Sequence, residues 1–492
     1  MSEHKLDWAK RWLEKPIRHY WGGEFNSGNS SQKFQSSNPA TEENLTEIPE
    51  GSAVDVDAAV AAAESGFKNP AWRNISRRER ARVLRQMGEL VRKHQAELAT
   101  LEALSNGKTY KEAFYDDMPD SADVFDYYAG WTDKFYGESC PVDGSFVNFT
   151  QRDPIGVCGL IVPWNFPLLL ANWKIAPALA MGNTVVVKPA PFTSLSLIRF
   201  AELIHEAKIL PPGVFNVVLG GATAGEAISR HSRIGKVSFT GSTVVGRRIV
   251  EGSAGSNLKG VTLELGGKSP NIIFDDIADL EGTVQRSFGS MFSHKGEKCS
   301  EPTRFFLHEK IYNRFLESLI PKVDAVICGE QFDPKSQQGA QCHKAQFEKI
   351  LSYIEIGKSE GAKLLAGGER TGKKGYFVRP TVFGEVSQKM RIAQEEIFGP
   401  VVSCIPFRTE EEVVAMANDT GYGLAAGVFT ADVSRAHRVA QALEAGMVFV
   451  NHYGCYDFAS PFGGMKESGW GREMAIHSLE SYTRLKSIWI KY

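Results

Sequence analysis

The chain has 492 residues, which is too many for one compact core, so we expect two or three domains. Hydrophobic residues make up 42% and charged residues 23% of the sequence, an ordinary globular composition. The formal net charge of −2 argues against a nucleic-acid-binding surface or a polybasic membrane patch and indicates a protein that acts on small molecules.

The seven cysteines are scattered along the chain. They form no CxxC pair and no Cys/His cluster with metal-ligand spacing, so we predict no metal site. An odd number without a disulfide framework indicates free thiols in a reducing compartment. The N-terminus lacks the apolar core of a secretory signal, and prolines, asparagines and Lys174 interrupt the apolar stretch 157–181. We therefore expect a cytosolic protein without a membrane partner.

Helical patterns come first in chain order, over 54–64 and 76–104. From residue 156 onward, short strand patterns alternate with helical patterns. The strands are predicted over 156–162, 184–189, 214–220, 236–240 and 261–265, and the helices near 168–181, 196–207, 223–231 and 243–252. Such alternation is typical of a doubly wound parallel sheet, which binds ligands at the carboxyl ends of its strands.

A second α/β unit is predicted after residue 267. Its strands lie over 271–276 and 303–308, and its helices near 279–292 and 311–326. The segments 127–148 and 479–492 are strand-like but lie outside both units. The last strand either completes its own domain or pairs with another subunit, because an exposed apolar edge normally needs a partner.

Three motifs place reactive groups in or beside these elements. The GEKC motif (296–299) offers Cys299, whose thiolate would be a strong nucleophile, although a lone cysteine is usually structural. Glu264 ends an apolar strand, where burial would raise its pKa and suit it to act as a general base; capping or a salt bridge is the alternative. Asn165 lies between the prolines of PWNFP and could either donate to an oxyanion or form an Asx turn.

Together these motifs resemble those of the aldehyde dehydrogenase superfamily, in order and spacing over nearly the whole chain. The similar segments are NPATEE (38–43), YYAGW (127–131), PWNFP, VVVKP, FTGSTVVG, LELGGKSP, GEKC, EEIFGPV (395–401) and SPFGGMKESGWGRE (460–473).

The resemblance implies an α/β fold with three parts. These are a doubly wound parallel-sheet cofactor-binding domain over 1–131 and 155–262, an α/β catalytic domain over 263–466, and a small β oligomerisation domain over 132–154 and 479–492. It also implies a homodimer or homotetramer.

The reaction implied by the resemblance is oxidation of an aldehyde to a carboxylic acid with NAD(P)⁺. Cys299 would attack the carbonyl, while the Asn165 side chain and the Cys299 backbone N–H would hold the oxyanion. Hydride transfer to the nicotinamide would leave a thioester, and Glu264 would activate water to release the acid. Glu473 matches a second family carboxylate with a proton-relay role, or is an exposed salt-bridging residue.

Two other functions are open to this fold. One is a coenzyme A-acylating semialdehyde dehydrogenase, whose members typically lack the base that Glu264 supplies. The other is a non-catalytic structural or binding descendant, which would be expected to lose Cys299 or Glu264. The presence of Cys299, Asn165 and Glu264 in their motifs favours the hydrolytic enzyme.

No GxGxxG fingerprint follows a strand. Instead, the turn from Gly241 to Gly246 opens a helix whose N–H groups and dipole suit a pyrophosphate. The resemblance assigns phosphate contacts to Ser242 and Trp164, the adenosine ribose to Lys188 and the nicotinamide ribose to Glu396. The full set of cofactor candidates is Trp164, Lys188, Gly241, Ser242, Gly246, Glu396 and Phe398.

Pro191 occupies the position at which NAD-preferring relatives often carry a glutamate that binds the ribose hydroxyls. Without that carboxylate, a 2′-phosphate would meet no like-charge repulsion. We expect NAD as cofactor and leave NADP open.

The resemblance places two aspartates and several aromatic residues at the substrate tunnel. Asp116 and Asp120 fall at its mouth, where they would favour a cationic aldehyde or simply form a solvated acidic helix start. Pro119 can move that helix start past Asp116. The aromatic candidates, Phe166, Trp173, Tyr456 and Phe462, suit an apolar or aryl group or an ammonium held by cation–π contact.

Overall fold

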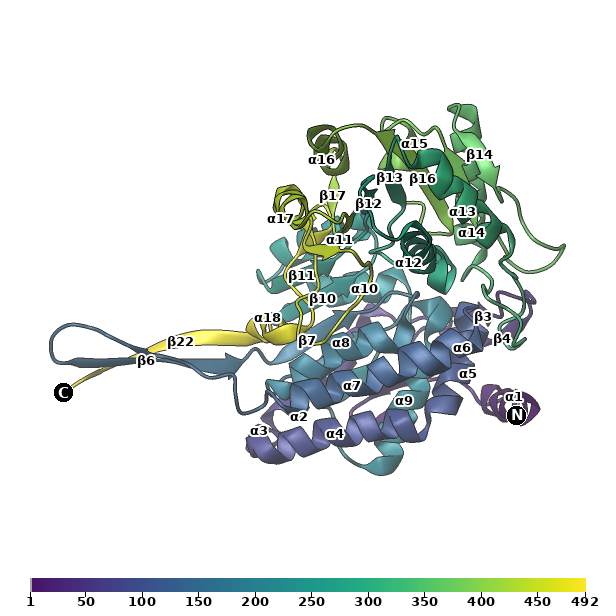
Figure 1. Cartoon of the computed structure of the whole chain (residues 1–492). Helices are drawn as coiled ribbons and strands as arrows, with labels where there is room; N and C mark the ends of the chain where they lie inside the picture. Colours follow the sequence, from purple (N-terminus) through teal and green to yellow (C-terminus); the bar gives the residue numbers. More distant parts are fainter. Residues whose placement is uncertain (1) are drawn as a thin grey trace.

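The computed structural model describes residues 2–492. Two open sheets flanked by helices form two adjacent α/β bodies, and an arm that belongs to a separate three-stranded sheet extends away from both (Figure 1). The predicted α/β class with parallel sheets is confirmed.

The first sheet has eight strands in the order β2-β1-β9-β8-β7-β10-β11-β21. The run from β9 to β11 is parallel throughout, as the alternation of strands and helices predicts. All residues of β7, β8 and β10 are buried, because helices cover both faces of the sheet. The strands are β1 (His19–Trp21), β2 (Glu24–Asn26), β7 (Val157–Ile161), β8 (Thr184–Lys188), β9 (Phe215–Val217), β10 (Lys236–Thr240), β11 (Gly260–Glu264) and β21 (Gly469–Trp470).

The helices of this body include α8, which is buried along its whole length. The long helix predicted over 76–104 is wrong in one respect, because His94 has non-helical dihedral angles and separates α4 from α5. The helices are α1 (Ser2–Leu13), α2 (Ala53–Lys68), α3 (Pro70–Arg73), α4 (Arg77–Lys93), α5 (Gln95–Asn106), α6 (Tyr110–Glu112), the π-helical turn η1 (Ala113–Asp117), α7 (Met118–Ala129), α8 (Pro167–Ala180), η2 (Pro191–Thr193), α9 (Leu195–Ala207), α10 (Ala222–Arg230) and α11 (Thr243–Ala254).

The second sheet has seven strands in the order β14-β15-β16-β13-β12-β18-β19. Its strands are β12 (Pro270–Ile273), β13 (Arg304–His308), β14 (Lys363–Ala366), β15 (Thr381–Gly384), β16 (Val401–Phe407), β18 (Ala425–Phe429) and β19 (Met447–Val450). Its helices are α12 (Leu280–Phe292), η3 (Ser293–Gly296), α13 (Tyr312–Asp324), α14 (Lys344–Ser359), α15 (Arg391–Gln394), α16 (Glu410–Asn418) and α17 (Val433–Ala442).

The arm pairs β6 (Phe146–Pro154) with the C-terminal β22 (Thr483–Lys491) over their full length (Figure 1). Large apolar side chains, among them Leu485, Trp489 and Ile490, are exposed on it. The strand prediction is wrong at one end of each segment, since α7 continues to Ala129 and α18 covers Ala475–Glu480. The remaining strands are β3 (Lys33–Ser37), β4 (Asn44–Pro49), β5 (Ser139–Cys140), β17 (Tyr422–Gly423) and β20 (Met465–Lys466).

Among residues 2–492, no helix is both long and apolar enough to cross a bilayer.

Candidate active site

A wide groove and a smaller cavity meet at the carboxyl ends of β7, β10 and β11, where a doubly wound sheet binds its ligands. The groove has a volume of about 700 Å³ and the cavity about 150 Å³. Both are lined by Pro163, Trp164, Thr240, Gly241 and Ser242, so they are continuous.

Cys299 lines the smaller cavity, just after η3. Burial, followed by the negative charges of Glu264 and Glu396, raises the pKa of the Cys299 thiol. The thiol therefore keeps its proton near neutral pH until a base removes it. The two carboxylates lie close enough to influence its ionisation, as a base partner must.

Asn165 lines the same cavity and approaches the loop that carries the thiol. Its Nδ2 donates to the carbonyl oxygen of Glu297 at 2.9 Å. An amide nitrogen carries two hydrogens, so this bond fixes the side chain and leaves the second hydrogen available to a ligand in the cavity.

Glu264 is the last residue of β11 and is 3% exposed. Neither of its carboxylate oxygens has a hydrogen-bond partner among the described residues. Burial, reinforced by the nearby charge of Glu473, raises the pKa of Glu264 well above its ordinary value. An unpaired buried carboxylate of this kind is suited to accept and release protons.

Glu473 is buried, so the exposed position considered for it is wrong. Its carboxylate forms an ion pair with Lys174 and accepts a hydrogen bond from Ser238 at 3.1 Å. Lys174 also donates to Thr240 at 2.8 Å. The sequence reasoning missed Lys174 as a site residue, although it is the one charged residue in the apolar helix PLLLANWKIAPALA.

The predicted phosphate-binding turn follows β10 and opens α11. Ser242 caps this helix, since its side chain accepts from the backbone N–H of Val245, and the amides of the first turn face the groove end. Lys188, also in the groove, donates to the carbonyl oxygens of Pro189 and Gly220 at 3.0 and 2.9 Å. Burial lowers the pKa of Lys188 to about 8.

Trp164 lines both the groove and the smaller cavity. Its ring makes edge contacts with Phe398 and His343, with centroids 5.2 and 5.3 Å away. Glu396 reaches the cavity from the other body, where it accepts a hydrogen bond from the backbone N–H of Gly267 at 3.0 Å. The two bodies thus face each other across the predicted nicotinamide end.

Two further cavity residues, Gln346 and Lys349, were not predicted. Both lie on α14, one helical turn apart, and Gln346 donates to the backbone of Ile397 and Phe398. Because α14 has no motif of its own, only its contact with the 396–398 segment in the fold identifies these residues.

The predicted tunnel aromatics fall into two groups. Trp173 and Tyr456 pack on Phe462 with ring centroids 5.2 and 5.7 Å apart, and the Tyr456 hydroxyl lies 2.6 Å from that of Ser300, next to the thiol. Phe166 lies instead between the Lys108 ammonium and the His294 ring.

Asp116 and Asp120 are both exposed near the start of α7. Pro119 does not separate them, because η1 leads directly into α7. Burial, with Asp123 and Asp116 nearby, raises the pKa of Asp120 to about 6. Burial, followed by the charge of Glu112, raises the pKa of Asp116, while Lys108, Lys111 and Lys298 act in the opposite direction.

The sequence profile of the aldehyde dehydrogenase family matches residues 25–488. The chain belongs to this family. It is 49% identical to aldehyde dehydrogenase 1A1 of Gallus gallus over 97% of this chain and 94% of that protein. It is 47% identical to retinal dehydrogenase 2 of Rattus norvegicus over 97% of this chain and 92% of the relative.

Solved structures of aldehyde dehydrogenases also match nearly the whole chain. The NAD⁺ complex of the Bacillus cereus aldehyde dehydrogenase is 44% identical, with a TM-score of 0.96 and coverage of 100% and 99% of the two chains. An indole-3-acetaldehyde dehydrogenase of P. syringae, in complex with NAD⁺ and IAA, is 39% identical with a TM-score of 0.96 and covers 99% of each chain.

The protein is thus an NAD- or NADP-dependent enzyme that oxidises aldehydes to carboxylic acids. These relatives favour neither the coenzyme A-acylating reaction nor a non-catalytic descendant. The groove of this aldehyde dehydrogenase is lined by the N-terminal turn of α11 and by Lys188.

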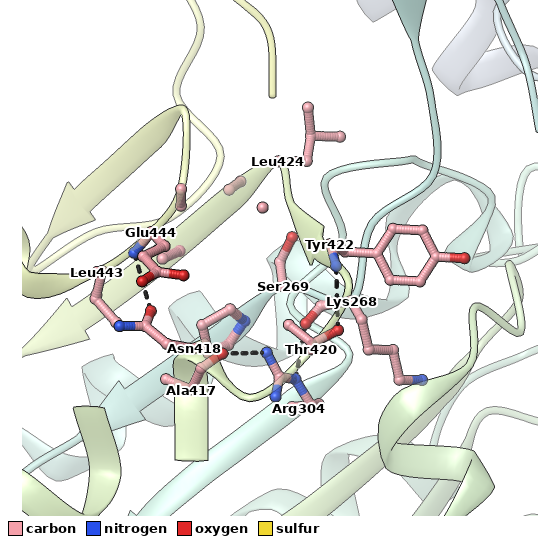
Figure 2. Close-up of a pocket in the computed structure, with 15 residues that line it drawn as sticks. Lys268, Ser269, Arg304, Ala417, Asn418, Thr420, Tyr422, Leu424, Leu443 and Glu444 are labelled. Carbon is pink, nitrogen blue, oxygen red and sulfur yellow. Dashed lines mark hydrogen bonds between the residues drawn. The ribbon is translucent and has the colours of Figure 1, made fainter. Parts of the chain in front are cut away.

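A separate hollow of about 10 Å³ lies at the amino ends of β12, β13 and β18 (Figure 2). It has room for about one water molecule. Arg304 spans it and donates to the backbone of Ala417 at 2.8 Å and of Lys268 at 2.7 Å (Figure 2). Arg304 therefore connects β13 to α16 and to the loop before β12, and the hollow is too small for a substrate.

Proposed function

We propose that this enzyme oxidises its aldehyde through a thioester on Cys299, which is hydrolysed by a water molecule that Glu264 activates. One observation carries the proposal: the Cys299 thiol and the Asn165 amide line one cavity, continuous with the dinucleotide groove, and the Glu264 carboxylate lies close enough to raise the pKa of the thiol.

In the first step the Cys299 sulfur bonds to the aldehyde carbon, after a water molecule accepts the thiol proton. The developing oxyanion accepts two hydrogen bonds, one from the free N–H of the Asn165 amide and one from the backbone N–H of Cys299. The nicotinamide cofactor, held in the groove and cavity, would supply the acceptor for the hydride that leaves this carbon. A water molecule then attacks the thioester while Glu264 removes its proton. The acid is released and Cys299 leaves as the free thiol.

We assign proton removal from Glu264 to the buried pair of Lys174 and Glu473. Glu473 raises and Lys174 lowers the pKa of Glu264, so all three are electrostatically coupled. The pair can exchange a proton with Glu264 through water in the site.

We assign the two ends of the dinucleotide to the groove and the cavity. Ser242, with the amides of the turn from Gly241 to Gly246, would hold the pyrophosphate, and Lys188 the adenosine ribose. Glu396 and Phe398 would hold the nicotinamide riboside, with Trp164 between the two ends.

The proline at position 191 leads to a testable prediction about the choice between NAD and NADP. It lines the groove beside Lys188, so NADP should be accepted as well as NAD. Pro191→Glu should raise the NAD-over-NADP ratio of kcat/KM by about tenfold or more, because a carboxylate near the 2′-phosphate costs about 1–4 kcal/mol. Pro191→Gln is the uncharged control and should leave the ratio unchanged. Equal ratios for the Glu and Gln variants would contradict the assignment.

We propose an apolar or aryl aldehyde as substrate. The Trp173, Phe462 and Tyr456 cluster reaches Ser300, beside the nucleophile. The charge of Asp116 is partly offset by lysines, which weakens the case for a cationic aldehyde. The similarity to enzymes named for retinal and indole-3-acetaldehyde also supports this substrate class.

The test of function is kcat/KM for a neutral aryl aldehyde and a size-matched aminoaldehyde, measured by the absorbance of reduced nicotinamide. We expect the aryl aldehyde to be preferred by about tenfold, roughly the discrimination of one apolar contact. Asp120→Asn, measured above pH 6 where Asp120 is ionised, should not change that preference. An aminoaldehyde preference that Asp120→Asn abolishes would instead identify a cation-selective mouth.

We further propose the division into a cofactor domain (1–131 and 155–262), a catalytic domain (263–466) and oligomerisation strands (132–154 and 479–492). The exposed apolar residues of the arm support a homodimer or homotetramer formed through it. The seven free cysteines support a reducing compartment such as the cytosol.

A further inference from the structure

A buried circuit of hydrogen bonds and one ion pair connects Asn165 to the loop that carries Cys299. It has four members: Asn106, Asn165, Lys295 and Glu297. The Lys295 ammonium donates to the backbone oxygen and Oδ1 of Asn106 at 2.8 and 2.9 Å and lies 2.7 Å from the carboxylate of Glu297. The side chains of Lys295 and Glu297 are each 1% exposed.

Both members of the Lys295–Glu297 ion pair are connected to Asn165 by hydrogen bonds. On one side, the backbone oxygen of Glu297 accepts the Nδ2 hydrogen of Asn165 at 2.9 Å. On the other, Nδ2 of Asn106 donates at 2.8 Å to the backbone oxygen of Trp164, the residue before Asn165. Lys295 therefore holds both the side chain and the backbone of the predicted oxyanion donor.

The same pair restrains the nucleophile. Glu297 precedes Cys299 by two residues, and its Oε1 accepts from the backbone N–H of Cys342 at 3.0 Å. The loop also contains His294 and Lys295 with φ of +47° and +64°, a left-handed conformation that is strained for residues with side chains. A strained loop keeps its shape only where its surroundings hold it. Here the Lys295 side chain contributes to that restraint, beside Glu112, which accepts from the His294 N–H at 2.7 Å, and Gln341, which donates to the Lys295 carbonyl at 3.3 Å.

We propose that Lys295, through its ion pair with Glu297 and its bonds to Asn106, is a positioning residue that fixes Asn165 relative to Cys299 for stabilisation of the oxyanion. This inference rests on the proposed roles of Asn165 and Cys299. The Lys295 ammonium is tied to Asn106 and Glu297, and its effect passes through Asn165.

A double-mutant cycle on the full-length enzyme tests it, with kcat/KM for the aldehyde, the Kd of NAD and the melting temperature as readouts. Lys295→Met should lower kcat/KM about tenfold or more, and Asn165→Ala about 10²-fold or more. In the Asn165→Ala background, Lys295→Met should cost less than about twofold, because residues that act through one contact are not additive. The Kd of NAD should stay within about twofold in each variant.

Two variants keep the result interpretable. Glu297→Gln retains the backbone oxygen used by Asn165 and should behave as Lys295→Met does, which covers the case in which the methionine variant does not fold. Leu319→Ala, in the buried core of α13, should lower the melting temperature without lowering kcat/KM.

If the losses in kcat/KM of Lys295→Met and Asn165→Ala multiplied in the double variant, the positioning role of Lys295 would be overturned. An Asn165→Ala enzyme of full activity would instead overturn the proposed role of Asn165, so the two failures are distinguishable.

Discussion

Cys299→Ala should lower kcat by about 10⁴-fold or more, which corresponds to about 5 kcal/mol of lost transition-state stabilisation. The variant has no side-chain atom that can bond to the aldehyde carbon. Neither the covalent adduct of thiol and aldehyde, which gives up the hydride, nor the thioester that follows it can form. Steady-state reduction of the nicotinamide is the measurement, with titration of cofactor binding to verify that the groove is intact.

The matched control is Cys328→Ala. Cys328 is also a partly buried free cysteine, but it lies outside the cavity and its sulfur contacts the backbone of Val378. Its replacement should leave kcat unchanged. If Cys299→Ala retained more than about a hundredth of the wild-type rate, covalent catalysis at this position would be excluded.

Glu264→Gln should produce one rapid equivalent of reduced cofactor per active site, followed by turnover that is slower than wild type by about 10²–10⁴-fold. The amide cannot take a proton from water, so the thioester accumulates on Cys299. Stopped-flow absorbance would give the burst amplitude, and mass spectrometry of the quenched protein would detect the acylated cysteine.

The pH profile gives a second signature of the same residue. The pKa of Glu264 is raised well above its ordinary value, so the fraction in the basic form grows as pH rises through that raised pKa. Wild-type kcat should therefore increase with pH over this range, and the Gln variant should lack that limb. A full-rate Gln variant would contradict the base assignment. A slow variant without a burst would place Glu264 before hydride transfer rather than after it.

The local signals in the sequence were sufficient for the parallel centre of the first sheet, for two of the seven strands of the second sheet, and for the reactive groups next to the strand ends. The alternation of buried strands and helices specifies a parallel sheet, and parallel sheets bring the carboxyl ends of their strands to one edge. Asn165, Ser242 and Glu264 each come just after or at the end of a strand, so their convergence could be expected.

Long-range pairing could not be read in this way. Lys174 and Glu473 are 299 residues apart and form a buried ion pair only because α8 and the C-terminal segment pack together. The π-helical turn η1 is also without a clear pattern, and within it Asp117, rather than Asp116, faces the interior and pairs with Lys108. Charge partners across a fold depend on packing that periodicity does not encode.

The return of the chain at β21 has a consequence for how the enzyme is made. This strand adds residues 469–470 to the edge of a sheet whose other strands all come from residues 19–264, and it pairs with β11 beside Glu264. During synthesis on the ribosome, the cofactor-binding body therefore cannot complete its sheet while the second body is still emerging. Such distant contacts form slowly, which leaves the unfinished edge exposed to aggregation or to chaperones until the chain is released.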